Sequence, residues 1–560
     1  MNTLPLSIQP LREVAREAGL ADELLIPYGR DKAKIELAAL HGPKRGAGRL
    51  ILVSAINPTP AGEGKTTTAI GLSMGLRRLG KKALLSLREP SLGPVFGVKG
   101  GGTGGGKASL HPADDINLHF TGDLHAITSA HNLLSALADN VAYHRQKLGD
   151  KGELDARLIT WGRALDMNDR FLRRCILGLG GKAHGMPREA RFDITAASEV
   201  MAILALARDY EDLAARLSRI VVGSSDLGQP ITAKDVGAEG AMTALLRDAL
   251  LPNLAQTDEG GPALVHCGPF ANIAHGCSSL LATQLAMQLS DYAITEAGFG
   301  FDLGGEKFLD LKCRALGAWP RMVVLVATLR ALKMHGGAPV KEASAKNGER
   351  LERGIAHLEK HLESAASFGL PAVVAINVFP DDSEEELLQV EAAAARLGAR
   401  TARSSGFAQG GAGTLDLARV VAEVADGTDA APPTARYAYE LEDALPLKLQ
   451  KIAQTVYGAK QVQLTSSAEA DLKRLTSWGF AGLPVCVAKT QLSLSDNAAL
   501  YGRPRDFTVT VRELRGSIGA GFVVALTGEV MTMPGLPAQP AASKVRLQAD
   551  GKIRGLMQND

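Results

Sequence analysis

Residues 49–80 read RLILVSAINPTPAGEGKTTTAIGLSMGLRRLG, the pattern of a strand, a glycine-containing loop and a helix in succession. Leu50 to Ile56 is an apolar run rich in β-branched residues, as in a strand buried inside a sheet. Proline and glycine then interrupt the chain, and from Gly64 onward apolar side chains recur at helical spacing. A glycine loop between a strand and a helix is a context in which proteins bind phosphate groups.

The chemistry of this loop favours a nucleoside triphosphate. Lys65 supplies a positive charge for the phosphates, and the Thr66 hydroxyl is suited to hold Mg²⁺. The match to G-x-x-x-x-G-K-T is incomplete, because Thr59 stands where the first glycine belongs. A chance turn before an amphipathic helix is the alternative, and the run GEGKTTT directly after a strand disfavours it. The predicted ATP-binding residues are Thr59, Pro60, Ala61, Gly62, Glu63, Gly64, Lys65, Thr66 and Thr67.

The composition argues against several other classes of protein. A chain of 560 residues predicts three or four domains of roughly 100–200 residues each. Its net charge of +2, from 62 basic and 60 acidic residues, indicates no general affinity for polyanions. Aromatic residues make up 4%, too few for a surface that stacks single-stranded nucleic acid. We therefore expect no nucleic-acid partner.

The cysteines and the apolar runs bear on the compartment. The 5 cysteines are widely spaced and form no C-x-x-C, so they predict neither a disulfide framework nor a zinc site. The N-terminal segment is amphipathic and lacks the apolar core of a signal peptide. Apolar runs such as 322–327 are far shorter than the roughly 18 residues of a membrane span. The sequence thus predicts a soluble, cytoplasmic protein without membrane association.

Strands and helices alternate along most of the chain. Strands are expected at 82–87, 158–161, 263–266, 291–296, 321–329, 371–378, 400–403, 485–489, 507–512 and 522–526. Helices are expected at 8–41 (interrupted near 27–29), 123–146, 197–217, 349–367, from 383, 446–456 and 468–478. This order predicts an α/β fold: a P-loop-containing parallel sheet flanked by helices, with two smaller α/β domains. The predicted divisions are 1–345 for the nucleotide-binding domain, 346–430 and 431–560, with a linker at 425–432.

Two further segments could approach the phosphates. Arg88 leaves the strand at 82–87 at the end where parallel sheets meet ligands, so it is either a second anion clamp or a surface partner of Glu89. Six glycines lie between Lys99 and Lys107, a density that no helix or strand interior tolerates. A loop of N–H groups near the nucleotide is favoured there over a flexible linker. The histidines of the helix at 123–146 are expected to be structural rather than metal ligands.

Long motifs distributed over almost the whole chain resemble formate–tetrahydrofolate ligases. In order they are TPAGEGKTT, LREPSLGPVFGVKGG, DINLHFTGD, LDMNDR, VHCGPFANIAHGC, EAGFGFDLGGEKF, INVFPDD, LPVCVAKTQ and MPGLP. The resemblance implies ATP-dependent ligation of formate to tetrahydrofolate in one-carbon metabolism, giving 10-formyltetrahydrofolate, ADP and phosphate through formyl phosphate. It also implies a homotetramer whose small-molecule substrates are formate, tetrahydrofolate and ATP with Mg²⁺.

The resemblance assigns roles to individual residues. Lys65 and Arg88 are the expected catalytic residues, Lys65 toward the phosphates and Arg88 toward formyl phosphate. Thr66 is the expected Mg²⁺ ligand. Glu89 matches a position linked to a stimulatory monovalent cation, K⁺ or NH₄⁺, although a carboxylate beside an arginine could equally form only an ion pair.

The folate slot is implied by aromatic side chains, since a pterin ring stacks well on aromatic faces. The resemblance places folate at Phe299, Phe379, Pro380 and Phe407, with ordinary core packing as the alternative for the phenylalanines. Four departures from the family pattern bear on folate affinity rather than on the reaction. Phe407 replaces a tryptophan in a WAKGGEGG-like stretch, in which Gln409 and Ala412 replace charged residues, and Phe301 replaces the alanine of GFGADLG.

Two other functions remain open at this point. Dethiobiotin-synthetase-type ligases also activate a carboxylate with ATP, but they are much shorter and lack the INVFPDD and AKTQ stretches. A partition-type switch ATPase would dimerise with nucleotide and bind DNA or a membrane. The absence of a basic patch disfavours it.

Overall fold

The computed structural model describes residues 7–60, 62–98, 101–427, 433–528 and 530–556. Its largest element is a 12-stranded sheet with the order β1-β2-β14-β15-β4-β16-β3-β17-β18-β19, to which β5 and β6 attach at β14. From β15 to β19 all neighbours are parallel. The strands are β1 (Leu25–Pro27), β2 (Ala33–Ile35), β3 (Arg49–Ala55), β4 (Ala83–Leu87), β5 (Gly104–Gly105), β6 (Ala108–His111), β14 (Asn253–Thr257), β15 (Pro262–Val265), β16 (Tyr292–Glu296), β17 (Met322–Ala327), β18 (Ala372–Asn377) and β19 (Arg400–Ser404).

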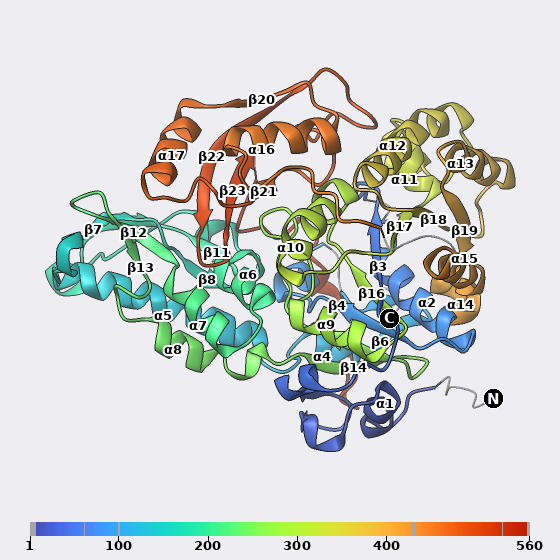
Figure 1. Cartoon of the computed structure of the whole chain (residues 1–560), viewed down its shortest axis with the longest axis horizontal. Coiled ribbons are helices and arrows are strands. Elements are labelled where there is room, and N and C mark those ends of the chain that lie inside the picture. The colour runs from blue at the N-terminus through green and yellow to red at the C-terminus, as the bar shows by residue number, and fades with distance from the viewer. Residues whose placement is uncertain (1–6, 61, 99–100, 428–432, 529, 557–560) are drawn as a thin grey trace.

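Helices cover both faces of this sheet (Figure 1). Strand β3 lies inside it, and alternate residues of β3 therefore enter two different cores: Leu50 and Leu52 pack on the side of α9, whereas Ile51 and Val53 pack on the side of α2. An apolar run without polar alternation is what such a doubly covered strand requires. The helices are α1 (Leu11–Ala18), α2 (Lys65–Arg78), α3 (Leu92–Phe96), α4 (Ala113–Asn117), α9 (Leu280–Leu289), α10 (Cys313–Leu316), α11 (Leu329–His335), α12 (Gly348–Ser367), α13 (Glu384–Arg396), α14 (Gly406–Gln409) and α15 (Leu415–Asp426).

The segment between β6 and β14 supplies most of a further core, to which residues of the C-terminal part such as Cys486 and Phe522 also contribute. The helix expected at 123–146 is confirmed as α5, but the one expected at 197–217 is two helices. The chain is extended at Ala207, and the Asp209 carboxylate then caps α7 by accepting from the N–H of Asp212. The elements are α5 (Asp123–Tyr143), α6 (Glu199–Leu206), α7 (Tyr210–Ser218), α8 (Glu239–Leu245), β7 (Leu154–Ile159), β8 (Arg163–Leu165), β9 (Cys175–Leu177), β10 (Arg188–Ala190), β11 (Phe192–Ile194), β12 (Val221–Ser225) and β13 (Pro230–Thr232).

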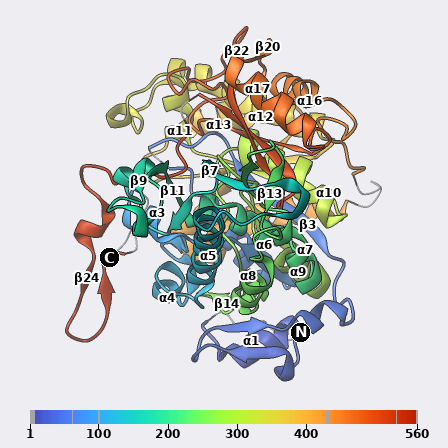
Figure 2. The same cartoon turned by 90° about the vertical axis from the view of Figure 1, so that its left-hand side faces the viewer.

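The C-terminal part has a separate four-stranded sheet with the order β20-β22-β23-β21. Here the expected helices and strands are confirmed, and a hairpin of β24 and β25 projects from the body of the molecule (Figure 2). The main sheet continues across residue 345, because β17 pairs with β18. The elements are α16 (Leu445–Ile452), α17 (Ser466–Ser477), β20 (Gln461–Leu464), β21 (Val485–Ala488), β22 (Thr508–Ser517), β23 (Phe522–Thr527), β24 (Arg546–Leu547) and β25 (Ile553–Arg554).

The helix expected over residues 8–41 is wrong beyond its first turns. Helix α1 ends where Gly19 adopts the left-handed conformation, with φ +85°. The residues that follow form the antiparallel pair β1–β2, and β2 also pairs with β14. This pairing with a strand more than 200 positions away satisfies the backbone better than a local helix. No helix within the described ranges is long and apolar enough to cross a membrane.

Candidate active site

The loop between β3 and α2 is held by its own side chains. Gly64 adopts a left-handed conformation with φ +73°, and α2 begins at Lys65. Thr59 donates through its backbone N–H and its hydroxyl to Glu63 Oε1, at 2.7 and 3.0 Å. Lys65 Nζ donates to the carbonyl oxygen of Phe299 at 2.8 Å. The lysine and the N-terminus of α2 thus lie together at the carboxyl end of β3, as a phosphate site requires.

Asn377, the last residue of β18, supports the loop from the neighbouring strands. Its Nδ2 donates to the carbonyl oxygen of Glu63 at 2.6 Å, and its Oδ1 accepts from the Thr68 hydroxyl at 3.0 Å. A Cβ on Gly64 would lie 2.7 Å from this Nδ2, so both the space and the positive φ require glycine. Of the predicted ATP-binding residues, Ala61 lies outside the described residues; the others lie in this loop and the first turn of α2.

Glu296 is the main functional residue that the sequence did not reveal. It ends β16, which lies between β3 and β4 in the sheet. Its buried carboxylate accepts from the Thr66 hydroxyl at 2.8 Å and pairs with Arg88 Nη2 at 3.4 Å. Burial by itself would raise the pKa of Glu296, but the charges of Arg88 and Lys65 outweigh burial and lower it. An acid at a strand end was visible in the sequence, whereas the strand order that makes it a neighbour of the loop was not.

Arg88 points toward Glu296 and forms no ion pair with Glu89. Its Nη1 donates weakly to the carbonyl oxygen of Pro269 at 3.4 Å, and its Nε is buried without a hydrogen-bond partner. A Cβ on Gly298 would lie 2.8 Å from Nη1, so glycine leaves the room that the guanidinium occupies. The surface ion pair offered as an alternative is therefore absent, and Arg88 joins Lys65 and Thr66 around one carboxylate.

Glu89 occupies a different, fully buried environment. Its Oε2 has no hydrogen-bond partner. Burial raises the pKa of Glu89 well above its usual value, the negative charge of Asp123 adds to this, and Lys34 opposes it. Lys34 itself is paired with Asp123 at 2.7 Å. Glu89 thus has a buried carboxyl oxygen without a hydrogen-bond partner, and its surroundings favour the neutral form.

None of the predicted folate residues belongs to the hydrophobic core. Phe299 and Phe379 are half-buried, Pro380 is exposed, and Phe407 is 48% exposed. The guanidinium of Arg330 lies over the Phe379 ring at 4.0 Å from its centroid. Phe299 contacts the start of α2, because its carbonyl accepts from Lys65 at 2.8 Å. Phe407 contacts the end of the glycine run instead, where its carbonyl accepts from the backbone N–H of Lys107 at 2.8 Å.

The departures from the family pattern fall in two places. Phe301 is fully buried and packs edge-on against Phe368 at 6.0 Å between ring centroids, so its ring is part of the core. Gln409 and Ala412 are exposed and line a surface hollow of about 390 Å³ that also includes Arg403 and Arg419. Of these departures, only Gln409 and Ala412 lie where they could affect a ligand bound beside Phe407.

The glycine run is a folded turn where it is described, from residue 101 onward; Lys99 lies outside the described residues. Gly104 and Gly105 form β5 and pair with β6. A Cβ on Gly105 would lie 3.1 Å from the Phe407 ring and 4.0 Å from the Thr67 hydroxyl. The run therefore packs between the predicted folate wall and the phosphate loop, and the linker interpretation is wrong for this part.

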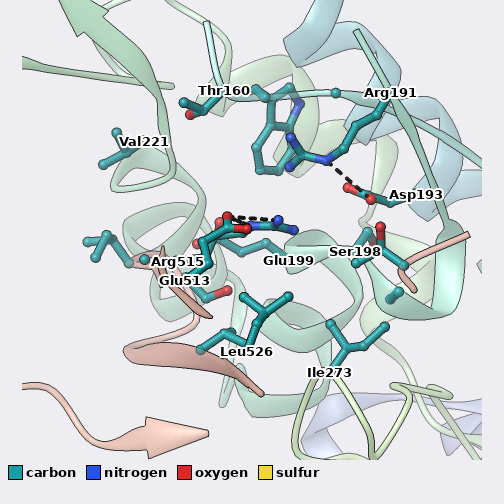
Figure 3. A pocket seen from close by; sticks show the side chains of 18 of the residues that line it. Thr160, Arg191, Asp193, Ser198, Glu199, Val221, Ile273, Glu513, Arg515 and Leu526 are labelled. Atoms are coloured by element: carbon teal, nitrogen blue, oxygen red, sulfur yellow. Dashed lines mark hydrogen bonds and ion pairs between the residues drawn. The ribbon is translucent and has the colours of Figure 1, made fainter. Parts of the chain in front are cut away.

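A separate cavity of about 300 Å³ lies between the segment containing β7–β13 and the C-terminal sheet (Figure 3). His131 and Trp161 stack in its wall at 4.2 Å between ring centroids, which confirms His131 as structural. Each of the arginines that line it has a carboxylate partner, so it offers no unbalanced charge for nucleotide phosphates. The pairs are Arg174–Glu189, Arg188–Asp139, Arg191–Asp193, Arg474–Asp471 and Arg515–Glu513.

Comparison with known proteins gives a consistent result. The family model described as formate–tetrahydrofolate ligase matches residues 4–557. A formate–tetrahydrofolate ligase of Myxococcus xanthus (strain DK1622) is 60% identical over 557 residues, which is 99% of this chain and 100% of the relative. A formate–tetrahydrofolate ligase of Methylobacterium sp. (strain 4-46) is 52% identical over 552 residues, covering 98% of each.

Proposed function

The chain belongs to the formate–tetrahydrofolate ligase family, and from this premise we propose how its residues carry out the ATP-dependent ligation of formate to tetrahydrofolate. The membership confirms the resemblance drawn from the sequence motifs. The chain matches this family over almost its whole length. This match excludes both alternative functions, a shorter carboxylate-activating ligase of the dethiobiotin-synthetase type and a partition-type switch ATPase.

The proposed chemistry has two steps. First, a formate oxygen bonds to the γ-phosphorus of ATP while the bond to the β–γ bridging oxygen breaks, which releases ADP and leaves formyl phosphate. Second, the N10 amine of tetrahydrofolate bonds to the formyl carbon, the bond from that carbon to the phosphate oxygen breaks, and the amine proton is lost. Formate is already an anionic nucleophile, so the first step requires positioned positive charge rather than a general base.

The observation that carries this proposal is that Thr66 and Arg88 both contact Glu296, and that the charge of Lys65 acts on the same carboxylate by lowering its pKa. These groups come from the ends of three adjacent strands and meet at one edge of the sheet. Lys65 would hold the ATP phosphates. The guanidinium of Arg88 would hold formate and then formyl phosphate, because its planar fork matches carboxylate and phosphate oxygens. Glu296 keeps Arg88 in place before the substrates arrive, whereas the Phe299 carbonyl holds Lys65.

Thr66 and Glu296 are the residues that would hold the Mg²⁺ accompanying ATP. A hydroxyl and a carboxylate joined at 2.8 Å supply the kind of oxygen ligands that magnesium takes alongside phosphates. When bound, the ion would neutralise charge on the phosphate oxygens. Because neighbouring cations lower the pKa of Glu296, its carboxylate is ionised at neutral pH and available as a ligand.

Formate labelled with ¹⁸O on both oxygens tests the two-step route. If formyl phosphate forms, one formate oxygen ends in inorganic phosphate and the other in the formyl group of the product. Mass spectrometry of the phosphate should therefore find one ¹⁸O per turnover. Unlabelled phosphate with labelled product would rule out this route while leaving the overall ligation intact.

Glu89 is proposed to bind a monovalent cation, because its buried Oε2 has no hydrogen-bond partner and a bound cation would favour the ionised form of this carboxyl. Glu89→Gln should abolish the stimulation of turnover by K⁺ or NH₄⁺, measured as the ratio of rates with the salt and with tetramethylammonium. Glu189→Gln, at an exposed carboxylate, is the control. Stimulation that survives in Glu89→Gln would assign Glu89 to an ordinary structural role.

We propose that residues 346–430 supply the folate slot through Phe379, Pro380 and Phe407. Phe407→Ala should raise KM for tetrahydrofolate about tenfold, since an aromatic stack contributes about 0.5–1.5 kcal/mol beyond area burial. Phe407→Trp should lower KM, because the indole offers more area. KM for ATP should stay unchanged in both variants, and in the control Phe171→Ala, at a phenylalanine 86% exposed. An unchanged folate KM in Phe407→Ala would remove this residue from the slot.

By the same resemblance, we propose that the protein is a homotetramer of the cytoplasm. Light scattering coupled to gel filtration should give four times the 58.8 kDa of the chain. The mass of a single chain would contradict the tetramer.

A further inference from the structure

Asn57, two residues before the predicted ATP-binding loop, is fully buried, and its polar groups are hydrogen bonded to segments far away in sequence. Its Nδ2 donates to Asp302 Oδ2 at 3.2 Å and to the carbonyl oxygen of Gln491 at 2.9 Å. Its Oδ1 accepts from His361 Nε2 at 3.1 Å, and its carbonyl oxygen accepts from His335 Nε2 at 2.9 Å. In a solvent-exposed loop, water could hydrogen bond to these groups; at the buried Asn57 the protein itself must supply the partners.

His335 at the end of α11 and His357 and His361 on α12 form a buried histidine cluster. The rings of His335 and His357 stack at 3.8 Å between centroids, and those of His357 and His361 meet edge-on at 4.7 Å. Three side chains that are 4% exposed or less therefore surround the single residue Asn57. Burial lowers the pKa of each, that of His361 to about 4, so all three are neutral at pH 7.

The hydrogen bonds assign one proton to each ring. His357 Nδ1 donates to the carbonyl oxygen of Gly502 at 2.8 Å, so its Nε2 is the unprotonated nitrogen and accepts from the N–H of Asn57 at 3.4 Å. His361 and His335 donate to Asn57 through Nε2. In this arrangement both oxygens and all the N–H groups of Asn57 have partners, and His361 Nε2 also lies 3.3 Å from the unprotonated His357 Nε2.

The C-terminal part of the chain completes the contact. Lys489 pairs with Asp302 at 2.7 Å, and both side chains are at most 1% exposed. Gln491 and Gly502 contribute carbonyl oxygens from the same segment, residues 489–502, which follows β21. Residues more than 400 positions further along the chain thus hold Asn57, which lies just after β3 and directly before Pro58.

We propose that Asn57 and the histidine cluster are positioning residues for the nucleotide site, through which the segment 489–502 controls the placement of the phosphate loop. The inference rests on the proposed binding of ATP phosphates by residues 59–67. The loop begins two residues after Asn57, and Thr59 holds Glu63 through two hydrogen bonds. A displaced Asn57 would therefore move the N–H groups that face the phosphates. A network that only stabilised the fold would leave nucleotide affinity unchanged.

The test compares two histidines that are equally buried but lie in different parts of the fold. His361→Leu removes a donor to Asn57, whereas His131→Leu removes a buried histidine whose pKa is also lowered to about 4 but which stacks on Trp161, away from the loop. Kd for MgADP is measured by titration calorimetry on the full chain, and Tm by calorimetric scanning. We expect both variants to lower Tm, and only His361→Leu to weaken MgADP binding, by about tenfold. His361→Gln, whose amide nitrogen takes the position of Nε2, should restore the affinity.

Equal MgADP affinity in His361→Leu and His131→Leu, with similar losses of Tm, would overturn the inference. If His361→Leu does not fold, the comparison of His361→Gln with His361→Asn decides instead. Glutamine places its amide nitrogen near the position of Nε2, whereas asparagine places it near Nδ1, away from Asn57. Only His361→Asn should then bind MgADP weakly. Lys65→Ala, measured alongside, separates the two proposals. Undiminished MgADP binding in Lys65→Ala would refute the nucleotide site itself rather than the role of Asn57.

Discussion

Replacing Lys65 with alanine is expected to lower kcat/KM for ATP by about 10²–10³-fold, the usual effect of removing one preorganised group that stabilises developing charge. Lys65 is anchored on the Phe299 carbonyl at the N-terminus of α2, so its charge is in place before ATP binds. The measurement is formate- and tetrahydrofolate-dependent ADP release at varied ATP. KM for tetrahydrofolate should change less than kcat/KM for ATP, because, of the predicted folate residues within the described ranges, only Phe299 is shown in contact with Lys65, and this contact is through its backbone carbonyl.

Lys81→Ala is the matched control for this prediction. Lys81 follows α2, is 41% exposed and pairs with Asp426 at 3.4 Å, an exposed contact whose loss should change kcat/KM by less than about twofold. A Lys65→Ala enzyme as active as Lys81→Ala would show that the phosphates bind elsewhere.

Glu296→Gln is expected to lower kcat by about 10²–10³-fold and to raise the Mg²⁺ concentration needed for half-maximal rate. Glutamine keeps the size of the side chain but removes the charge that pairs with Arg88 and accepts from Thr66. The variant thus loses a magnesium ligand and leaves a partly buried guanidinium without its counter-charge. The measurement is kcat as a function of free Mg²⁺ at saturating substrates.

Asp291→Asn provides the comparison at the other end of the same strand. Asp291 precedes β16 and accepts from the backbone N–H of Ala47 at an exposed site. Its replacement should leave the Mg²⁺ dependence as in the unchanged protein. The same Mg²⁺ dependence in Glu296→Gln would exclude Glu296 as a ligand and leave it only the role of orienting Arg88.

The parts of the fold and site that could be predicted from sequence are those written in contiguous residues. Strand β3, the loop and α2 carry their apolar spacing, their glycines and Lys65 within one stretch of 32 residues. Arg88 could be nominated because it leaves the next strand along the chain. The buried strands β15 to β18 were recognisable for the same reason, as short apolar runs between helices.

The remaining features depend on which strands become neighbours. Glu296 meets Thr66 only because β16 lies between β3 and β4, and Asn377 reaches Gly64 only because β18 follows β17 in the sheet. Residues 25–35 form strands rather than the expected helix because β2 pairs with β14, from the middle of the chain, and β1 then pairs with β2. The contacts of Asn57 likewise join segments that no local pattern connects.

The most direct test of the account is ADP release by the purified protein with and without formate and with and without tetrahydrofolate. The account predicts turnover only when both are present, with equal amounts of ADP and 10-formyltetrahydrofolate, and its loss in Lys65→Ala and Arg88→Ala. ATP hydrolysis that is indifferent to formate and tetrahydrofolate would contradict the ligase mechanism built on these residues.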